Sequence, residues 1–208
     1  MLLGAILVGA AGVFERYFPA PLSAALTLAL WMVLTGGLHL DGFLDACDGL
    51  LGGFDPEKRM EIMRDHHIGA FAFTGGALLF LMKFSALVAL RDTGWQFAGL
   101  LLAPALGRWA MTLAVAAFPY ARPQGLGREM KAHVTWRQVL LASITVLLAV
   151  WFAAYWRGLI ALIIAILVLI GVATFTLRRI PGLTGDIYGA VCELVELAVL
   201  LLFAARGF

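Results

Sequence analysis

Long apolar runs alternate with short polar stretches along most of the chain, and this alternation predicts membrane-spanning helices. Six runs approach the roughly 20 residues that a spanning helix needs: Leu22–Leu38, Ile68–Leu90, Trp95–Phe118, Val139–Tyr155, Leu159–Leu177 and Ile187–Ala205. A shorter run, Leu2–Phe14, is either a seventh span or a helix lying in the membrane interface. Segments of this kind are helices rather than barrel strands, so we expect an all-α transmembrane bundle of six to seven spans.

The composition supports a membrane protein. Of the 208 residues, 62% are hydrophobic and 13% are charged, whereas soluble domains have about half and about a quarter. The first run has no basic n-region and no A-x-A site, so we expect a membrane segment there rather than a secretory leader. There is no internal repeat or low-complexity tract, which favours a single integral membrane domain over residues 1–208.

Basic residues between the runs are distributed unevenly. If Leu2–Phe14 spans, one side holds Lys58, Arg59, Arg64, Arg122, Arg128, Lys131, Arg178 and Arg179, and the other holds Arg16, Arg91, Arg157 and Arg206. An excess of lysine and arginine marks the cytoplasmic side, so we expect a multi-pass protein of the plasma (inner) membrane. The polar loops 39–67, 119–136 and 178–186 would then share the cytoplasmic face and form one site.

The stretch HLDGFLDACDG, residues 39–49, carries the densest group of carboxylates. Asp41, Asp45 and Asp48 are spaced four and three apart, which places them within roughly 60° on one helix face. Such carboxylates are tolerated when a divalent cation neutralises them, and oxygen ligands suit Mg²⁺. Asp65 is a fourth candidate ligand from the next polar segment. The alternative is a solvated acidic helix end.

Glycines and basic residues complete this candidate site. Gly42 and Gly49 would leave room for a phosphate beside the carboxylates. His39 is a candidate hydrogen-bond donor that orients Asp41. His67 is either a catalytic residue, as a general base or as a hydrogen-bond donor to phosphate, or a polar residue at the membrane interface. Arg122 is favoured as a phosphate clamp because a guanidinium binds phosphate in a bidentate manner. Basic residues beside membrane spans otherwise contact lipid headgroups.

A second acidic motif, GLTGDIYGAVCELVE, occupies residues 182–196. Asp186, Glu193 and Glu196 lie at offsets of seven and ten, within about 80° of one another on a helix. Acidic side chains inside an apolar run usually face a water-filled interior or a bound cation, so all three are candidate site residues. The structural alternative is an ion pair with Arg108 or Lys83.

Together these residues predict a Mg²⁺-dependent site for phosphoryl or phosphodiester transfer that faces the cytoplasm. A cation-coupled transporter would also explain acidic and basic residues inside the spans, but not carboxylates gathered in one polar loop. A purely structural membrane subunit is the least economical interpretation, since each charge at the centre of a span costs about 2.5–3.5 kcal/mol on insertion scales.

Three motifs, in this order, resemble the cobalamin synthase family, adenosylcobinamide-GDP ribazoletransferase: HLDGFLDACDG, RMEIMRDHHIGAF and GLTGDIYGAVCELVE. The resemblance covers nearly the whole chain. It implies a transferase of cobalamin (vitamin B12) biosynthesis that joins adenosylcobinamide-GDP to α-ribazole or α-ribazole 5′-phosphate. The products would be adenosylcobalamin, or its 5′-phosphate, and GMP, with Mg²⁺ bound to the diphosphate.

The resemblance also implies roles for particular residues. The metal ligands or the base would be Asp41, Asp45, Asp48 and Asp65. A second wall of the site would be formed by Thr184, Asp186, Glu193 and Glu196, with Arg122 as a phosphate clamp. The aspartate pattern is also distantly similar to that of CDP-alcohol phosphotransferases, which make phospholipids, but their D-G-x-x-A-R pattern is absent. Besides the substrates, we expect contact with a lipid bilayer and a possible homodimer, and no nucleic-acid partner.

Overall fold

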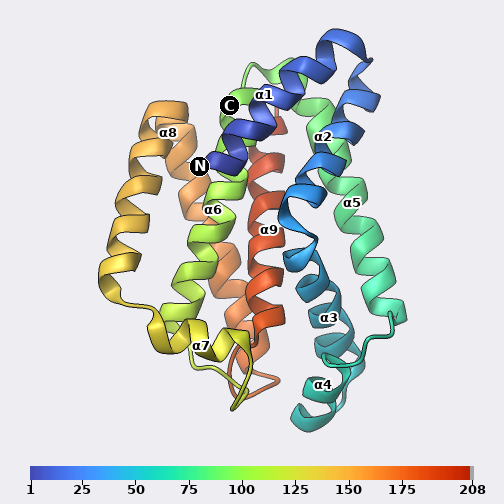
Figure 1. Ribbon diagram of the computed structural model, residues 1–208, viewed down its shortest axis with the longest axis vertical. Coiled ribbons are helices and arrows are strands. Elements are labelled where there is room, and N and C mark those ends of the chain that lie inside the picture. The colour runs from blue at the N-terminus through green and yellow to red at the C-terminus, as the bar shows by residue number, and fades with distance from the viewer. Residues whose placement is uncertain (207–208) are drawn as a thin grey trace.

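The structure, a computed structural model, describes residues 1–206 apart from the side chain of Leu126, and its elements in this range are helices (Figure 1). The all-α prediction is confirmed. The longer helices are α1 (Leu2–Tyr17), α2 (Ala20–Thr35), α3 (Leu38–Gly52), α5 (Ala70–Leu90), α6 (Gln96–Ala117), α8 (Trp136–Leu177) and α9 (Gly185–Ala204). The shorter ones are α4 (Pro56–Ile62), η1 (Arg91–Thr93) and α7 (Leu126–His133).

The helix α9 lies at the centre of the bundle (Figure 1) and packs against α3, α5, α6 and α8. Buried residues line it on all sides, including Val191, Val195 and Val199, which are fully inaccessible. A helix that is buried on all sides belongs in an interior. Thr184 caps its N-terminus, since its Oγ1 accepts a hydrogen bond from the Ile187 amide at 3.4 Å.

A glycine pair separates α2 from α3. Gly36 and Gly37 have φ values of 61° and 67°, a left-handed conformation that costs most other residues about 1–2 kcal/mol. The two helices are bent by 91° at this break. The apolar run predicted as Leu22–Leu38 therefore ends as a helix at Thr35, and the aspartates that follow are carried on a separate helix.

The long helix α8 is broken at Tyr155, where φ is 44° and ψ is −125°. Figure 1 shows that the two halves run in opposite directions, so this one element contains both predicted runs, Val139–Tyr155 and Leu159–Leu177. The tight reversal between the two halves of α8 requires glycine at position 158, because a Cβ there would lie 2.6 Å from the Val150 carbonyl oxygen.

Among the residues that the structure describes, four helices are long and apolar enough to cross a membrane: α5 with η1, α6, α8 and α9. The bent pair α2–α3 makes a fifth if it counts as one span. The predicted six to seven spans are not confirmed. The count is lower because α8 is counted once and because α1, with 16 residues, is only about 24 Å long, against a hydrocarbon core of about 30 Å. Figure 1 shows α1 across one end of the bundle.

One end of the bundle carries α4, α7 and the turn between α8 and α9, at the bottom of Figure 1. The segments expected as polar loops lie here, but much of their length is helical. The segment 39–67 contains most of α3 and all of α4, and the segment 119–136 contains α7. Regular structure therefore positions the candidate residues.

Candidate functional site

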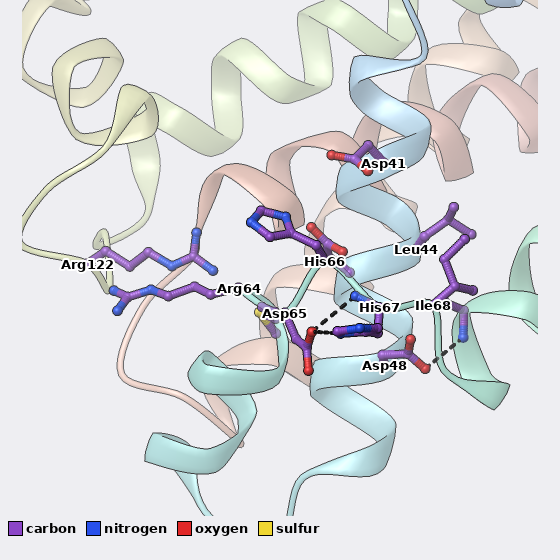
Figure 2. Close-up of a pocket in the computed structure, with 12 residues that line it drawn as sticks. Asp41, Leu44, Asp48, Arg64, Asp65, His66, His67, Ile68 and Arg122 are labelled. Atoms are coloured by element: carbon purple, nitrogen blue, oxygen red, sulfur yellow. Dashed lines mark hydrogen bonds and ion pairs between the residues drawn. The ribbon is translucent and has the colours of Figure 1, made fainter.

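Carboxylates from two segments line a cavity of about 440 Å³ near this end, which we call the carboxylate cavity. Asp41, Asp45 and Asp48 reach it from one face of α3, as their spacing predicts. Asp65 enters it from the segment between α4 and α5. Arg64 and Arg122 also line the cavity. In Figure 2 the Arg122 side chain extends toward α3, whereas the Arg64 side chain extends away from α3 toward the segment that carries Arg122.

Asp48 is bound by the N-terminus of α5. Its Oδ2 accepts a hydrogen bond from the Gly69 amide at 2.6 Å, and its Oδ1 accepts one from the Ala72 amide at 2.9 Å. The first amides of a helix lack partners within the helix, and a negative charge there is favourable. Asp48 is only 8% exposed. It therefore works as a cap supplied by a distant helix, and both of its oxygens are engaged.

Asp41 and Asp45 are different, because within residues 1–206 neither makes a hydrogen bond or an ion pair. Asp41 is exposed and Asp45 is half-buried. Two neighbouring carboxylates on one helix face repel each other unless a cation or a proton is present. Among the described residues, these two carboxylates of the cavity have both oxygens free of protein partners.

Asp65 is paired with its near neighbour in sequence. Its Oδ1 accepts a hydrogen bond from the His67 amide at 3.0 Å and lies 2.6 Å from the His67 Nδ1 (Figure 2). These hydrogen bonds lower the pKa of Asp65 below its ordinary value. The carboxylate is thus held ionised beside the cavity, and the histidine orients it.

The predicted four-carboxylate metal site is not preassembled. Within residues 1–206, no three His, Cys, Asp or Glu side chains lie close enough together to hold one metal ion. Mg²⁺ usually keeps several waters and is bound through one or two carboxylates together with substrate phosphates. The unpaired oxygens of Asp41 and Asp45 fit that smaller requirement, so this cavity suits Mg²⁺ arriving with a phosphate ligand.

Arg122 joins two cavities. Its Nη2 donates to Asp186 Oδ2 at 2.7 Å, and Thr184 Oγ1 donates to the same carboxylate oxygen at 3.1 Å. Its Nε is buried and has no hydrogen-bond partner among the described residues. A guanidinium has five N–H donors, so the pair with Asp186 fixes its position and leaves donors for an anion.

A short backbone pairing places Arg122. The Ala121 amide donates to the Leu183 carbonyl at 2.8 Å, and the Leu183 amide donates to the Pro119 carbonyl at 2.8 Å. A Cβ at Gly182 would lie 2.8 Å from the Ala121 nitrogen, so this approach requires glycine. The segment before α7 is thereby fixed to the turn before α9.

The second cavity has a volume of about 260 Å³, and we call it the tyrosine cavity because Tyr120 and Tyr188 line it. Asp41 and Arg122 line both cavities, and Asp186 lines the second. Burial raises the pKa of Tyr120, which lies outside the spans, so its hydroxyl stays protonated.

The glycines of α3 serve helix packing, which corrects the expectation that they leave room for phosphate. A Cβ at Gly42 would lie 3.0 Å from the Asp186 Cα, so α9 fills that space. The space beside Gly49 is filled by Met63 and Arg59. Close contact between α3 and α9 is what brings Asp41 and Asp186 to the same cavity.

Glu193 and Glu196 belong to a buried ion network. Lys83 Nζ donates to Glu193 Oε2 at 2.5 Å and to Glu196 Oε2 at 2.6 Å, and Arg108 Nη1 donates to Glu196 Oε1. Lys83 is 4% exposed, and the two glutamates are 7% and 1% exposed. Neither glutamate lines either cavity. The geometry therefore favours the structural alternative, an ion pair with Lys83 and Arg108.

Two other predicted residues are also engaged elsewhere. His39 lines the tyrosine cavity, but its Nδ1 lies 3.4 Å from the Arg108 Nη2, so its polar contact is with the ion network rather than with Asp41. Thr184 is fully buried, and its hydroxyl is occupied by the α9 cap and by Asp186. Its position supports a structural role at the start of α9.

Comparison with known proteins decides the family. A family model described as cobalamin-5-phosphate synthase matches residues 1–204. The chain belongs to the cobalamin-5-phosphate synthase family. The resemblance drawn from the three motifs is thus confirmed. No solved structure matches the chain.

Curated members of the cobalamin-5-phosphate synthase family match over most of their length. A protein of Desulfitobacterium hafniense named adenosylcobinamide-GDP ribazoletransferase is 39% identical over 207 residues, covering 97% of this chain and 81% of the relative. Proteins of the same name from Stutzerimonas stutzeri and Pseudomonas fluorescens are 42% and 44% identical. The first match covers 97% of this chain and 81% of the relative, and the second covers 88% and 75%.

Some cavity residues of this cobalamin-5-phosphate synthase family member were not singled out from the sequence. From the sequence, Arg64 counts only among the basic residues that indicate membrane topology, and Tyr188 has no predicted role. Tyr188 follows Asp186 by two positions, inside a motif already recognised. A hydroxyl within an otherwise apolar helical run was the available signal, because such a group needs a partner.

Proposed function

We propose that this chain is a membrane transferase that joins adenosylcobinamide-GDP to α-ribazole, or to α-ribazole 5′-phosphate, and releases GMP. The observation that carries the proposal is the family match over residues 1–204, together with the shared name of the relatives. The cavities add a physical basis, since carboxylates and arginines face one another where a diphosphate would bind. A CDP-alcohol phosphotransferase and a transporter are not favoured.

The reaction is a substitution at phosphorus. The ribose 3′-hydroxyl oxygen of the acceptor would form a bond to the phosphorus nearer the cobinamide, and the bond from that phosphorus to the bridging oxygen would break. GMP leaves with the electron pair. Asp41 lines both cavities and is unpaired, so it is placed to accept the hydroxyl proton.

Asp45 would hold Mg²⁺, which when bound neutralises charge on the diphosphate and on the leaving group. Arg64 and Arg122 line the same cavity and would contact the phosphate oxygens. The pair between Arg122 and Asp186 keeps that guanidinium positioned before the substrate arrives. Asp65, oriented by His67, adds negative charge beside the metal position.

For the location we propose the plasma membrane, with the cavities facing the cytoplasm. The segments at the cavity end of the bundle contain Lys58, Arg59, Arg64, Arg122, Arg128, Lys131, Arg178 and Arg179. Such an excess of lysine and arginine favours the cytoplasmic side. The homodimer stays a prediction.

The test uses detergent-purified protein with adenosylcobinamide-GDP, α-ribazole and MgCl₂, with GMP and corrinoid products followed by chromatography. We expect equal amounts of GMP and coupled corrinoid, both abolished by EDTA and restored by excess Mg²⁺. Asp92→Asn, at the opposite end of the bundle, is a matched control for Asp45→Asn. GMP released without coupled corrinoid would indicate a hydrolase and contradict the proposal.

A further inference from the structure

The two cavities share Asp41 and Arg122 but have different walls. The carboxylate cavity is lined mainly by charged and polar side chains, whereas the tyrosine cavity is lined by two tyrosines, two methionines and several glycines. Charged walls suit a diphosphate, and aromatic and apolar walls suit a flat ring. The shared residues mark the place where ligands in the two cavities would meet.

We propose that the tyrosine cavity binds the aromatic base of the nucleoside acceptor, while the carboxylate cavity binds the diphosphate of the donor. This inference rests on the proposed function and assigns its two substrates to separate places. The ribose of the acceptor then lies at the boundary, where Asp41 lines both cavities and Arg122 stands between them.

The tyrosines supply the first support. The rings of Tyr120 and Tyr188 are stacked, with centroids 6.1 Å apart and an interplanar angle of 27°. Tyr188 is buried behind Tyr120, so the half-buried Tyr120 ring is the one that would contact an aromatic base, and ring stacking tolerates many base types. Tyr120 is also fixed in place by the backbone pairing between residues 119–121 and Leu183.

The unpaired hydroxyl of Tyr188 supplies the second support for this assignment. Tyr188 is 2% exposed, and among the described residues its hydroxyl has no hydrogen-bond partner. Buried polar groups nearly always have a partner, so an unpaired one calls for an explanation. Tyr188 lines the cavity, so a small movement of its ring on binding would let a ring nitrogen or a sugar hydroxyl of the acceptor satisfy the group.

The size of the tyrosine cavity excludes the corrin ring of the donor. The cavity volume of about 260 Å³ lies near the lower end of the roughly 300–1,000 Å³ typical of small-molecule sites. It suits a base rather than a corrin ring with its side chains. A Cβ at Gly185 would meet nothing within 4 Å, so this lining position borders open space that a larger side chain would occupy.

The test is a substitution whose side chain would occupy the open space beside Gly185. Gly185→Leu is compared with Gly12→Leu, an exposed glycine on α1 where a Cβ also meets nothing within 4 Å. We expect Gly185→Leu to raise the KM for α-ribazole about tenfold or more, with the KM for adenosylcobinamide-GDP within about twofold of wild type. Calorimetric titration with α-ribazole should show the same loss of binding. Gly12→Leu should change neither value.

Tyr188→Phe gives an independent measurement. Loss of one hydrogen bond to the acceptor should weaken α-ribazole binding by about two- to tenfold, without lowering the thermal stability of the protein. Equal effects on both substrates, or unchanged α-ribazole binding in Gly185→Leu, would overturn the assignment. A wild type that binds α-ribazole but forms no product would instead contradict the proposed function. If that binding were lost in Gly185→Leu, the cavity assignment would stand.

Discussion

The ion network inside the bundle and the carboxylate cavity at its end both gather acidic side chains, and they treat them in opposite ways. Glu193 and Glu196 receive donors from Lys83 on α5 and Arg108 on α6. In the cavity, Asp41 and Asp45 have no such partner among the described residues. The difference indicates that the network holds helices together, whereas the cavity keeps charge available for a ligand.

The same contrast exists within α3. Asp48 looks equivalent to Asp41 and Asp45 in sequence, yet both of its oxygens are bound by amides of α5. A carboxylate with satisfied oxygens contributes to stability, and one with unsatisfied oxygens beside a cavity contributes to chemistry. Substitutions at the two kinds of position should therefore affect different measurements.

The largest effect is expected for Lys83→Met. Removing this cation leaves two buried carboxylates with Arg108 alone, and breaking a buried ion pair typically costs about 3–5 kcal/mol. Thermal unfolding in detergent measures the loss. Lys58→Met is the control, because Lys58 and Glu61 form an exposed pair at 2.8 Å, and such pairs contribute little to stability. Equal stability of the two variants would show that the network is not structural.

Asp45→Asn should produce the next largest effect, on activity. We expect the rate of GMP release to fall about 100-fold or more, since the carboxylate that would hold Mg²⁺ beside the reacting phosphate is lost. Stability should be unchanged or slightly higher, because repulsion from Asp41 decreases. Steady-state kinetics with the unfolding curve check both parts. A variant that unfolds early would place Asp45 with Asp48 instead.

Asp48→Ala should cost about 0.5–2 kcal/mol of stability, the usual range for loss of an N-terminal cap. Asp48→Asn should cost less, because its amide oxygen still accepts a hydrogen bond from α5. The measurement is the unfolding midpoint of both variants beside their activity per folded molecule. If activity vanished while stability held, Asp48 would be a metal ligand, as the sequence alone predicts.

The smallest effect is expected for His67→Ala. The pKa of Asp65 should rise toward its ordinary value because both the ring hydrogen bond and the orientation of the segment are lost. A lowered pKa in the folded protein adds stability above the ordinary pKa and loses it as pH falls through the lowered value. The small stability difference from wild type should therefore be present at neutral pH and disappear in acid. Carbon NMR of labelled aspartate follows the titration, and an unchanged pKa would contradict the pairing.

Spacing predicted the acidic face of α3 correctly, because a three-and-four pattern depends only on local helix geometry. The partners of that face were not predictable in the same way. Asp48 is bound by amides 21 and 24 positions away, and Gly42 is enclosed by α9. These contacts depend on tertiary packing, which a local pattern does not encode. Family resemblance, by contrast, identified the chain from its motifs.

The number of spans shows the same limit. Apolar runs located the membrane helices, but run length could not show that Gly36 and Gly37 turn the chain by 91°. Nor could it show that Lys83 and Arg108, considered only as alternatives, both reach Glu196. Hydrophobicity reports how much of a segment avoids water, and not which helix it meets.

The central helix α9 follows the other described helices in the chain, which gives the protein an order of assembly. During synthesis, α5 and α6 enter the membrane carrying Lys83 and Arg108 before the ribosome has made Glu193 and Glu196. Until α9 inserts among its neighbours, those cations lack their counter-ions and the wall containing Asp186 does not exist. A chain without α9 therefore lacks both the counter-ions of the buried network and the Asp186 wall of the tyrosine cavity.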